Sequence, residues 1–191
     1  MMSIQCDAHN FLTGNGYSIA LSAVIAQNSR AMTRSFSEPL YLICEDVRSL
    51  YNVGALFRTA EGAGVTRLYL VGYSPQPPRR EISKVALGAE WSVSWEHWAQ
   101  GWRLIERLKS QGVQIVALEN HVTGRISMNY RRLRPRFPLA LLVGNEVSGL
   151  SAGLLRRSDQ LIELPMHGAK KSLNVAVACG IALYELDRWR R

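Results

Sequence analysis

Three short segments of the chain place polar side chains directly after apolar runs, and these are the residues whose types and spacing could do chemistry. Asn52 and Arg58 lie in the first segment, Glu146 in the second, and Ser172 and Asn174 in the third. A guanidinium near a helix N-terminus favours anions, because both carry positive charge. Each segment reads as a strand-to-loop-to-helix turn. The pattern therefore predicts one active site assembled from three turns.

The first segment predicts a helix over residues 53–63. Asn52 is a suitable N-cap for this helix, and Gly62 or Gly64 is suited to end it. In this segment Arg58 comes four residues after Gly54, which has no side chain to obstruct it. Helical side chains lean toward the N-terminus, so the guanidinium is expected to point toward the Asn52 end.

The alternative for Arg58 is an ordinary surface arginine balanced by Glu61. The apolar residues that flank Arg58 on its helix weaken this alternative. An anion-binding role at the helix N-terminus is therefore preferred for Arg58.

The second segment, residues 139–150, is a buried strand that runs into a loop with two glycines. Gly144 allows the backbone to approach a flat ligand closely. Glu146 adds a carboxylate just beyond the end of the strand. The alternative is that Glu146 only caps or braces its loop.

The third segment joins a strand at residues 161–164 to a helix that begins near Leu173. Ser172 is the expected N-cap, and the small residues that follow let the helix pack closely on a sheet. His167 is expected to be a loop residue, because no carboxylate or cysteine accompanies it at relay or metal-ligand spacing.

The charge of the chain favours a nucleic-acid partner. The 191 residues contain 23 basic and 15 acidic side chains, for a net charge of +8, and 19 of the basic residues are arginines, whose planar fork suits phosphate. A generally basic solvated surface is the alternative. The sequence lacks the glycine-rich phosphate loop, the dinucleotide-binding fingerprint and the hydrolase nucleophile elbow, so those enzyme classes have no support.

The cysteines Cys6, Cys44 and Cys179 are odd in number and widely spaced. They predict neither a disulfide framework nor a zinc site, and they favour a reducing, cytoplasmic setting. The N-terminus does not resemble a secretory signal, and no apolar run approaches the roughly 20 residues needed to span a bilayer. We expect a soluble protein without membrane or metal partners.

The order of elements predicts a mainly parallel α/β sheet with helices on both faces. Residues 1–38 are interpreted as an N-terminal extension that contacts RNA, with one modest helical pattern at 19–27, and residues 39–191 as the catalytic domain. The expected strands span 40–44, 67–71, 93–95, 114–118, 139–143 and 161–164, and the expected helices span 53–63, 98–110, 152–157 and 173–188. A proline-rich loop follows residue 71, and a basic connector spans 125–138.

Two further patterns have alternative interpretations. Trp91, Trp95, Trp98 and Trp102 are spaced by four, three and four residues, which suits a core or dimer face better than a platform for stacking bases. The four arginines at positions 131, 132, 134 and 136 follow Tyr130. They suit either a solvated loop or contacts with an RNA backbone.

In family order, the three segments resemble the motifs of the SpoU (TrmH-like) RNA ribose 2'-O-methyltransferases. The matching runs are Asn52-Val53-Gly54 to Arg58-Thr59-Ala60, Val143-Gly144-Asn145-Glu146 to Gly149-Leu150, and Leu164-Pro165-Met166-His167-Gly168 to Ser172-Leu173-Asn174-Val175. The resemblance covers roughly residues 40–188. It implies a SPOUT-type α/β fold with a C-terminal trefoil knot and a homodimer.

The resemblance also implies the cofactor S-adenosylmethionine and a set of site residues. The cofactor residues carry over as Leu118, Glu119, Gly144, Leu164, Met166, Ser172 and Leu173, and the catalytic and RNA-contacting residues as Asn52, Arg58, Glu146, Ser172 and Asn174. Tyr51 before Asn52, and Ala176 where a serine is common, depart from the family pattern. Tyr51 bears on how the target nucleotide is held.

The expected reaction is methyl transfer to a ribose 2'-hydroxyl of tRNA or rRNA, with tRNA favoured because the chain is compact. In this hypothesis Glu146 orients Arg58, while Ser172 and Asn174 position the nucleotide or the cofactor. One alternative is a catalytically silent RNA-binding or assembly protein with the same fold, although the polar set is intact. Another is a methyltransferase for proteins or small molecules, which the arginine-rich charge disfavours.

Overall fold

The computed structural model of this chain describes residues 38–120, 122 and 124–190. Nearly all of the expected N-terminal extension, with the helical pattern at 19–27 and Cys6, lies outside the described residues. From residue 39 onward the chain alternates strands and helices, as predicted. Within the described part of the chain, no helix combines the length and apolar character that a membrane-crossing helix requires.

One sheet forms the centre of the described structure, and every pairing between its strands is parallel. Its order is β3-β2-β1-β6-β4-β7-β5. The strands are β1 (Leu40–Glu45), β2 (Arg67–Val71), β3 (Trp95–Trp98), β4 (Gln114–Leu118), β5 (Met128–Asn129), β6 (Leu139–Val143) and β7 (Gln160–Glu163). The central strands β1, β4 and β6 are buried along nearly their whole length, as expected for a sheet covered on both faces.

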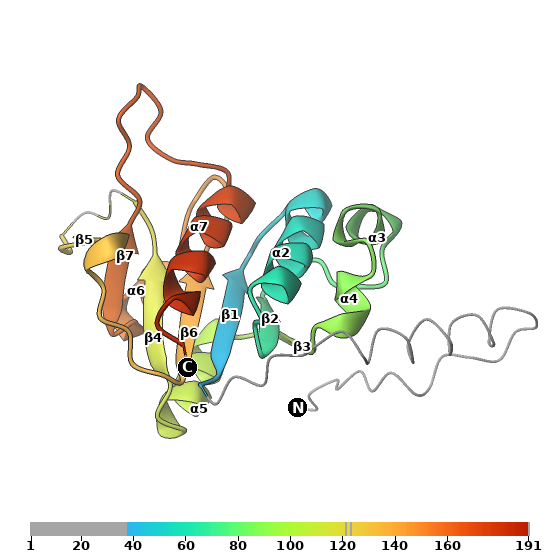
Figure 1. Cartoon of the computed structure of the whole chain (residues 1–191), viewed down its shortest axis with the longest axis horizontal. Helices are drawn as coiled ribbons and strands as arrows, with labels where there is room; N and C mark the ends of the chain where they lie inside the picture. Colours follow the sequence, from blue (N-terminus) through green and yellow to red (C-terminus); the bar gives the residue numbers. More distant parts are fainter. Residues whose placement is uncertain (1–37, 121, 123, 191) are drawn as a thin grey trace, which may run out of the picture.

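Helices cover both faces of the sheet (Figure 1). They are α2 (Leu50–Gly62), α3 (Arg80–Ala86), α4 (Ala89–Ser92), α5 (Gly101–Ser110), α6 (Ala152–Arg157) and α7 (Val175–Asp187), with a 3-10 turn η1 at Tyr130–Arg132. One apolar cluster joins the sheet to α2, α3, α4 and α7. A second cluster on the opposite face joins it to α5 and α6.

The structure confirms the expected α/β class and most of the expected elements. β2, β4, β6 and α6 have the predicted bounds, whereas β3 begins two residues later than expected and α5 three residues later. The helices α3 and α4 and the strand β5 were missed. These elements have only seven, four and two residues, too few for a hydrophobic period to emerge.

The four tryptophans do not share one face, because they lie on three different elements, although Trp95 and Trp98 do pack against the core. Trp91 is on α4 and 70% exposed, while Trp95 lies on β3 and packs edge-to-face against Phe57. Trp98 ends β3 and contacts the cluster on the other side of the sheet. Trp102 is on α5, beneath the guanidinium of an arginine. Residues four and three apart share one face only in a continuous helix, and β3 interrupts it here.

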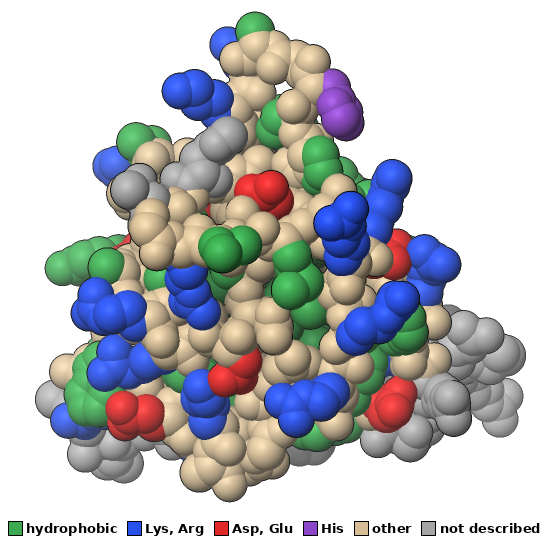
Figure 2. Space-filling view, turned by 90° about the vertical axis from the view of Figure 1, so that its left-hand side faces the viewer, with side chains coloured by type: hydrophobic (Ala, Val, Ile, Leu, Met, Phe, Trp, Pro, Cys, Tyr) green, Lys and Arg blue, Asp and Glu red, His purple; other side chains and the backbone are tan. Residues whose placement is uncertain are grey.

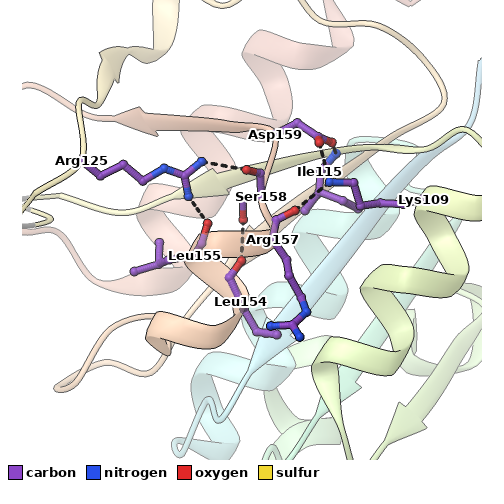
Figure 3. A network of polar contacts seen from close by, with 8 residues as sticks. All are labelled: Lys109, Ile115, Arg125, Leu154, Leu155, Arg157, Ser158 and Asp159. Carbon is purple, nitrogen blue, oxygen red and sulfur yellow. Dashed lines mark hydrogen bonds and ion pairs between the residues drawn. The ribbon is translucent and has the colours of Figure 1, made fainter.

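The connector between β4 and β6 is fastened to the C-terminal end of α6 (Figure 3). Arg125 donates hydrogen bonds to the carbonyl oxygens of Leu155 and Ser158, the latter at 2.7 Å. From α5, Lys109 donates to the carbonyl oxygen of Arg157 at 2.9 Å. The last carbonyls of a helix carry partial negative charge, so two cations stabilise this end. The contact fixes the connector to a helix on the α5 side of the sheet.

Close packing between α2 and α3 depends on Gly54. A Cβ atom at this position would lie 2.6 Å from the carbonyl oxygen of Ile82 and 2.9 Å from Cβ of Val85. Both are tighter than side chains tolerate. The packing of α2 on α3 therefore requires a glycine at position 54, in addition to the space that Gly54 leaves for the side chain of Arg58.

We expect Gly54→Ala to lower the free energy of unfolding by about 1–3 kcal/mol, because α2 and α3 must move apart to accept the methyl group. Gly153→Ala is the control, since the nearest atom to a Cβ there is 3.9 Å away. Alanine at that helical position should be neutral or stabilising by up to about 1 kcal/mol. Chemical denaturation of both variants checks the difference, and equal stability of the two would contradict it.

Candidate active site

The three predicted segments meet at one edge of the sheet. The loops after β1, β6 and β7 all leave from the carboxyl ends of parallel strands, where ligands of such sheets bind. In Figure 1 this is the upper edge, beyond which the loop between β7 and α7 projects. The fold thus places the expected site residues together.

Glu146 joins the loop after β6 to the loop after β1. Its Oε2 accepts a hydrogen bond from the backbone N–H of Arg48 at 2.9 Å, and its Oε1 accepts from the N–H of Ser49 at 3.0 Å. Oε1 also accepts from Nδ2 of Asn52 at 2.8 Å. Glu146 therefore both braces a loop, as in the alternative interpretation, and holds a predicted site residue.

Asn52 is also hydrogen-bonded to Asn174 of the third motif. Asn174 Nδ2 donates to Asn52 Oδ1 at 3.0 Å, while Asn174 Oδ1 accepts from the N–H of Ala176 at 2.9 Å. Glu146, Asn52 and Asn174 thus form a continuous hydrogen-bonded chain. Each member comes from a different motif, and the residues are separated by 94 and 122 positions in sequence.

The expected helix caps are wrong at both helices. Ser49, not Asn52, caps α2 by accepting from the N–H of Asn52, and Asn174, not Ser172, caps α7. The carboxamide of Asn52 is instead engaged by Glu146 and Asn174. Ser, Asn and Asp cap helices almost equally well, so tertiary contacts decided between neighbouring candidates.

The environment of Glu146 keeps its carboxylate ionised. Partial burial by itself raises the pKa of the carboxyl, but hydrogen bonds from Arg48, Asn52 and Ser49 outweigh it and leave the pKa below the ordinary value of 4.5. The carboxylate is an obligatory acceptor for these donors.

Arg58 is exposed on α2 and makes no hydrogen bond or ion pair with another residue of the described chain. It does not pair with Glu61, and Glu146 contacts Asn52 rather than Arg58. Arg58 lies six positions after Asn52 on the helix, which turns the two side chains about 120° apart around the helix axis. The hypothesis that Glu146 orients Arg58 has no support in these contacts. The Nη1 and Nη2 groups of Arg58 are therefore available to a ligand.

A second polar cluster holds the loops after β4 and β7. Asn120 donates to the carbonyl oxygens of Leu164 at 2.9 Å and Lys171 at 3.3 Å, and its Oδ1 accepts from the N–H of Leu164 at 3.1 Å. Glu119 accepts from the N–H of Leu150 at 2.8 Å. Asn120 was missed by the sequence analysis. Its position directly after a buried strand, next to Glu119, was the available signal.

The loop after β6 is a tight turn closed by Asn145 and Gly149, whose backbones exchange hydrogen bonds at 3.2 and 3.0 Å. Asn145 also donates through Nδ2 to the carbonyl oxygen of Asp46 at 2.7 Å. A Cβ on Gly144 would lie 2.5 Å from the backbone of Gly149 and 2.6 Å from that of Leu150. The turn itself therefore requires a glycine at position 144, and the close approach of a ligand there stays a prediction.

The remaining cofactor candidates line the same region with different exposure. Leu118 and Leu164 are buried, Met166 is half-buried, and Ser172 and Leu173 are exposed on the projecting loop. His167 is exposed in that loop, as expected for a residue without a relay partner. Among the described residues, no group of three or more His, Cys, Asp or Glu side chains is arranged to hold a metal ion.

We expect Glu146→Gln to lower Tm at pH 7, because an NH2 group would then face donors that require an acceptor. The pKa of Glu146 is lowered by folding, so its contribution is complete above about pH 4.5 and is lost as the pH falls through the lower folded value. The difference in Tm between wild type and variant should therefore shrink below pH 4.5. Thermal melts from pH 7 to about 3.5 test this, with Glu61→Gln as the charge control. A constant difference would contradict the clamp.

Comparison with known proteins agrees with this arrangement. The model of the SpoU rRNA Methylase family matches residues 39–184. The chain is 32% identical over 162 residues to tRNA (guanosine(18)-2'-O)-methyltransferase of Aquifex aeolicus, covering 84% of this chain and 74% of that protein. It is 34% identical over 154 residues to a 23S rRNA (guanosine-2'-O-)-methyltransferase of Vibrio vulnificus, covering 81% of this chain but only 61% of that enzyme.

A solved structure supports the same assignment. The AdoMet-bound rRNA methyltransferase from Sinorhizobium meliloti superposes with a TM-score of 0.74 at 33% identity, over 81% of this chain and 57% of that one. The resemblance drawn from the three motifs is confirmed, and so is the SPOUT-type α/β fold. The chain belongs to the SpoU rRNA methylase family.

Proposed function

We propose that this chain is an S-adenosylmethionine-dependent RNA methyltransferase that acts on a ribose 2'-hydroxyl. The observation that carries the proposal is the hydrogen-bonded chain Glu146–Asn52–Asn174, which unites the three family motifs. The relatives named as tRNA and 23S rRNA guanosine-2'-O-methyltransferases support the reaction class. The RNA substrate and the free, buried thiols of Cys44 and Cys179 are consistent with a cytoplasmic enzyme.

The residues after β4, β6 and β7 fit S-adenosylmethionine. The buried side chains of Leu118 and Leu164, with the half-buried Met166, offer an apolar surface for an adenine ring. Glu119 uses one carboxylate oxygen for Leu150 and the other for its neighbour Asn120, which leaves acceptor positions for ribose hydroxyls. The AdoMet-bound relative supports this cofactor. In the proposal Gly144, Ser172 and Leu173 complete the surface.

When bound, the cofactor supplies a methyl group carried on a sulfonium. The residues of this chain then have to align the ribose hydroxyl with that methyl group and assist loss of the hydroxyl proton. Asn52 and Asn174 are fixed by their mutual hydrogen bond and by Glu146, so they are placed to hold a nucleotide without reorganising. Ser172, on the projecting loop, contributes a hydroxyl to the same contact.

Arg58 is assigned an electrostatic role. A guanidinium has a pKa above about 12 and retains its proton in proteins, so it is unsuited to act as the base. Its exposure and its lack of a partner among the described residues leave its donor fork available for a phosphate. In the proposed mechanism Arg58 clamps the phosphate next to the target ribose and stabilises the developing alkoxide, while the proton passes to that phosphate or to solvent.

The charge distribution supports an RNA substrate. Lys and Arg side chains are spread over the face that carries β5 and the projecting loop, with Asp and Glu side chains between them in several places (Figure 2). The arginines that follow β5, at positions 131, 132, 134 and 136, are all exposed. We favour tRNA over rRNA, because the chain covers more of the tRNA-specific relative than of the rRNA-specific one.

The exposed face of α7 supports a homodimer. Val177, Ile181 and Tyr184 lie on one side of this helix and, with Ala55 and Thr59 of α2, line an apolar depression. The first ten residues of α7 are apolar or glycine on every side, although only one side packs on the sheet. Such an uncovered apolar surface is typical of an interface. A second copy of this chain is the proposed occupant.

The C-terminal trefoil knot is included in the proposal. β7 pairs with β4 on the side away from β6, yet the chain then returns to α7, which packs against α2 and β6. On this path residues 164 and 171 are held by Asn120, at the start of the connector between β4 and β6. In the proposal these two segments cross there, which is the arrangement that a knot requires.

The activity is tested by incubating the protein with S-adenosylmethionine tritiated on the methyl group and with bulk tRNA or rRNA. Tritium in RNA at a 2'-O-methylated nucleotide supports the proposal, and mapping of that nucleotide identifies the target. Calorimetric titration with S-adenosylmethionine distinguishes the silent RNA-binding alternative. Absence of cofactor binding together with absence of transfer to either RNA pool would favour that alternative.

We expect Arg58→Ala to reduce methyl transfer at least 100-fold while the Kd for S-adenosylmethionine changes less than about twofold, because Arg58 acts on the RNA and the transition state. Arg58→Lys should restore only a fraction of the rate, since an ammonium lacks the planar fork. Arg156→Ala, which removes an equal charge from the exposed surface of α6, is the control. Substantial turnover by Arg58→Ala would refute the assignment.

We expect the double substitution Val177→Glu and Ile181→Glu to convert a dimer into a monomer, because two buried carboxylates per protomer would face the partner. Light scattering coupled to size-exclusion chromatography measures the mass. Ile126→Glu, at a position that is 94% exposed outside this face, should remain dimeric. A wild-type monomer, or a dimer that survives the double substitution, would disprove this interface.

A further inference from the structure

Tyr73 has a backbone held by hydrogen bonds and an exposed side chain. Its side chain is 90% exposed, so it contributes almost nothing to the core. Its backbone N–H donates to Oδ1 of Asp46 at 2.7 Å. On one side the carbonyl oxygen of Gly72 contacts Nε2 of His97 at 2.9 Å. On the other side the buried Ser74 donates to the carbonyl oxygen of Cys44 at 2.9 Å. An exposed aromatic ring is thus carried on a rigid turn.

The turn that carries Tyr73 is fastened to the proposed active site. The backbone N–H of Val47 donates to Oγ of Ser74 at 3.0 Å, and Asn145 donates to the carbonyl oxygen of Asp46 at 2.7 Å. The neighbours of these residues along the chain are Arg48 and Glu146, which share a hydrogen bond. Tyr73 therefore projects from the loop after β2, directly beside the loops that hold Asn52.

The segments linked to the turn of Tyr73 carry positive charge and a second ring. Arg48 is exposed in the loop after β1, which is hydrogen-bonded to this turn, and Arg79 and Arg80 are exposed where the loop after β2 leads into α3. Tyr51, in the first turn of α2, is 54% exposed. Exposed aromatic rings between arginines are typical of surfaces that bind single-stranded nucleic acid, because rings stack on bases while arginines contact phosphates.

We propose that Tyr73 is a substrate-positioning residue whose ring stacks on an unpaired base of the RNA next to the methylated nucleotide. The proposal rests on the proposed function of the site. The rigid turn makes stacking efficient, because little backbone freedom remains to be lost on binding and a tyrosine side chain has only two χ angles to fix. Arg48, Arg79 and Arg80 neutralise the phosphates that flank the stacked base. The ring acts on RNA binding and has no contact with the cofactor residues described above.

The test compares Tyr73→Ala, Tyr73→Phe and Trp91→Ala in the tritium assay, with whichever RNA pool the wild type methylates. We expect Tyr73→Ala to raise KM for RNA about 5- to 150-fold, the range that corresponds to loss of one stacked base, with a smaller change in kcat. Tyr73→Phe keeps the ring and should retain a wild-type KM. Trp91→Ala removes another exposed ring, from α4, and should also have no effect.

Three further measurements separate stacking from a structural role. Tm and the Kd for S-adenosylmethionine should be unchanged in Tyr73→Ala, and the dependence of KM on salt should keep the wild-type slope, because no phosphate contact is removed. A wild-type KM for Tyr73→Ala would overturn this inference and leave the proposed function standing. Equal defects in Tyr73→Ala and Tyr73→Phe would also overturn it. Absence of transfer by the wild type would overturn both proposals.

Discussion

The carboxylate of Glu146 is the contact on which the arrangement of the site depends. Its two oxygens accept three hydrogen bonds from the loop after β1 and the first turn of α2, and Asn52 extends the contact to the N-terminus of α7. Loop N–H groups at the end of a parallel sheet have no strand partners, so a side chain or water has to satisfy them. Glu146 does this with a charge, which makes the bonds stronger and keeps the acid ionised.

A second carboxylate, that of Glu119, has the corresponding role in the loop after β4. Glu119 accepts the N–H of Leu150, and its neighbour Asn120 binds the loop after β7 at both Leu164 and Lys171. The two clusters divide the site: the Glu146 cluster fixes the residues assigned to the RNA, and the Glu119 cluster fixes the surface assigned to the cofactor. The turn formed by residues 144–150 belongs to both, because Glu146 lies in it and Leu150 donates to Glu119.

The proposed reaction makes few chemical demands on the protein, and the structure is consistent with that. Methyl transfer to an alkoxide cancels charge, so the site needs alignment and exclusion of water more than it needs a strong base. The fixed carboxamides of Asn52 and Asn174 supply alignment, whereas Arg58 remains exposed and unpaired within the described chain. One part of the site is therefore fixed before RNA binds, while the guanidinium of Arg58 is free to contact the RNA. This arrangement is expected of an enzyme whose site is completed by its RNA substrate.

The sequence by itself determined the alternation of strands and helices, the parallel sheet, the family and the identity of the polar residues, because hydrophobic period and local motif spacing are properties of short segments. It did not determine which of two neighbouring residues caps a helix: Ser49 replaced Asn52, and Asn174 replaced Ser172. It also gave Glu146 the wrong partner, and it missed Asn120 and the short helices α3 and α4. The short helices show no hydrophobic period, whereas the partners of Glu146, Asn52 and Asn120 depend on contacts between residues about 40 to 120 positions apart. Only the tertiary structure decided these contacts, because the parallel pairing of the strands brings the loops that follow them to one edge of the sheet.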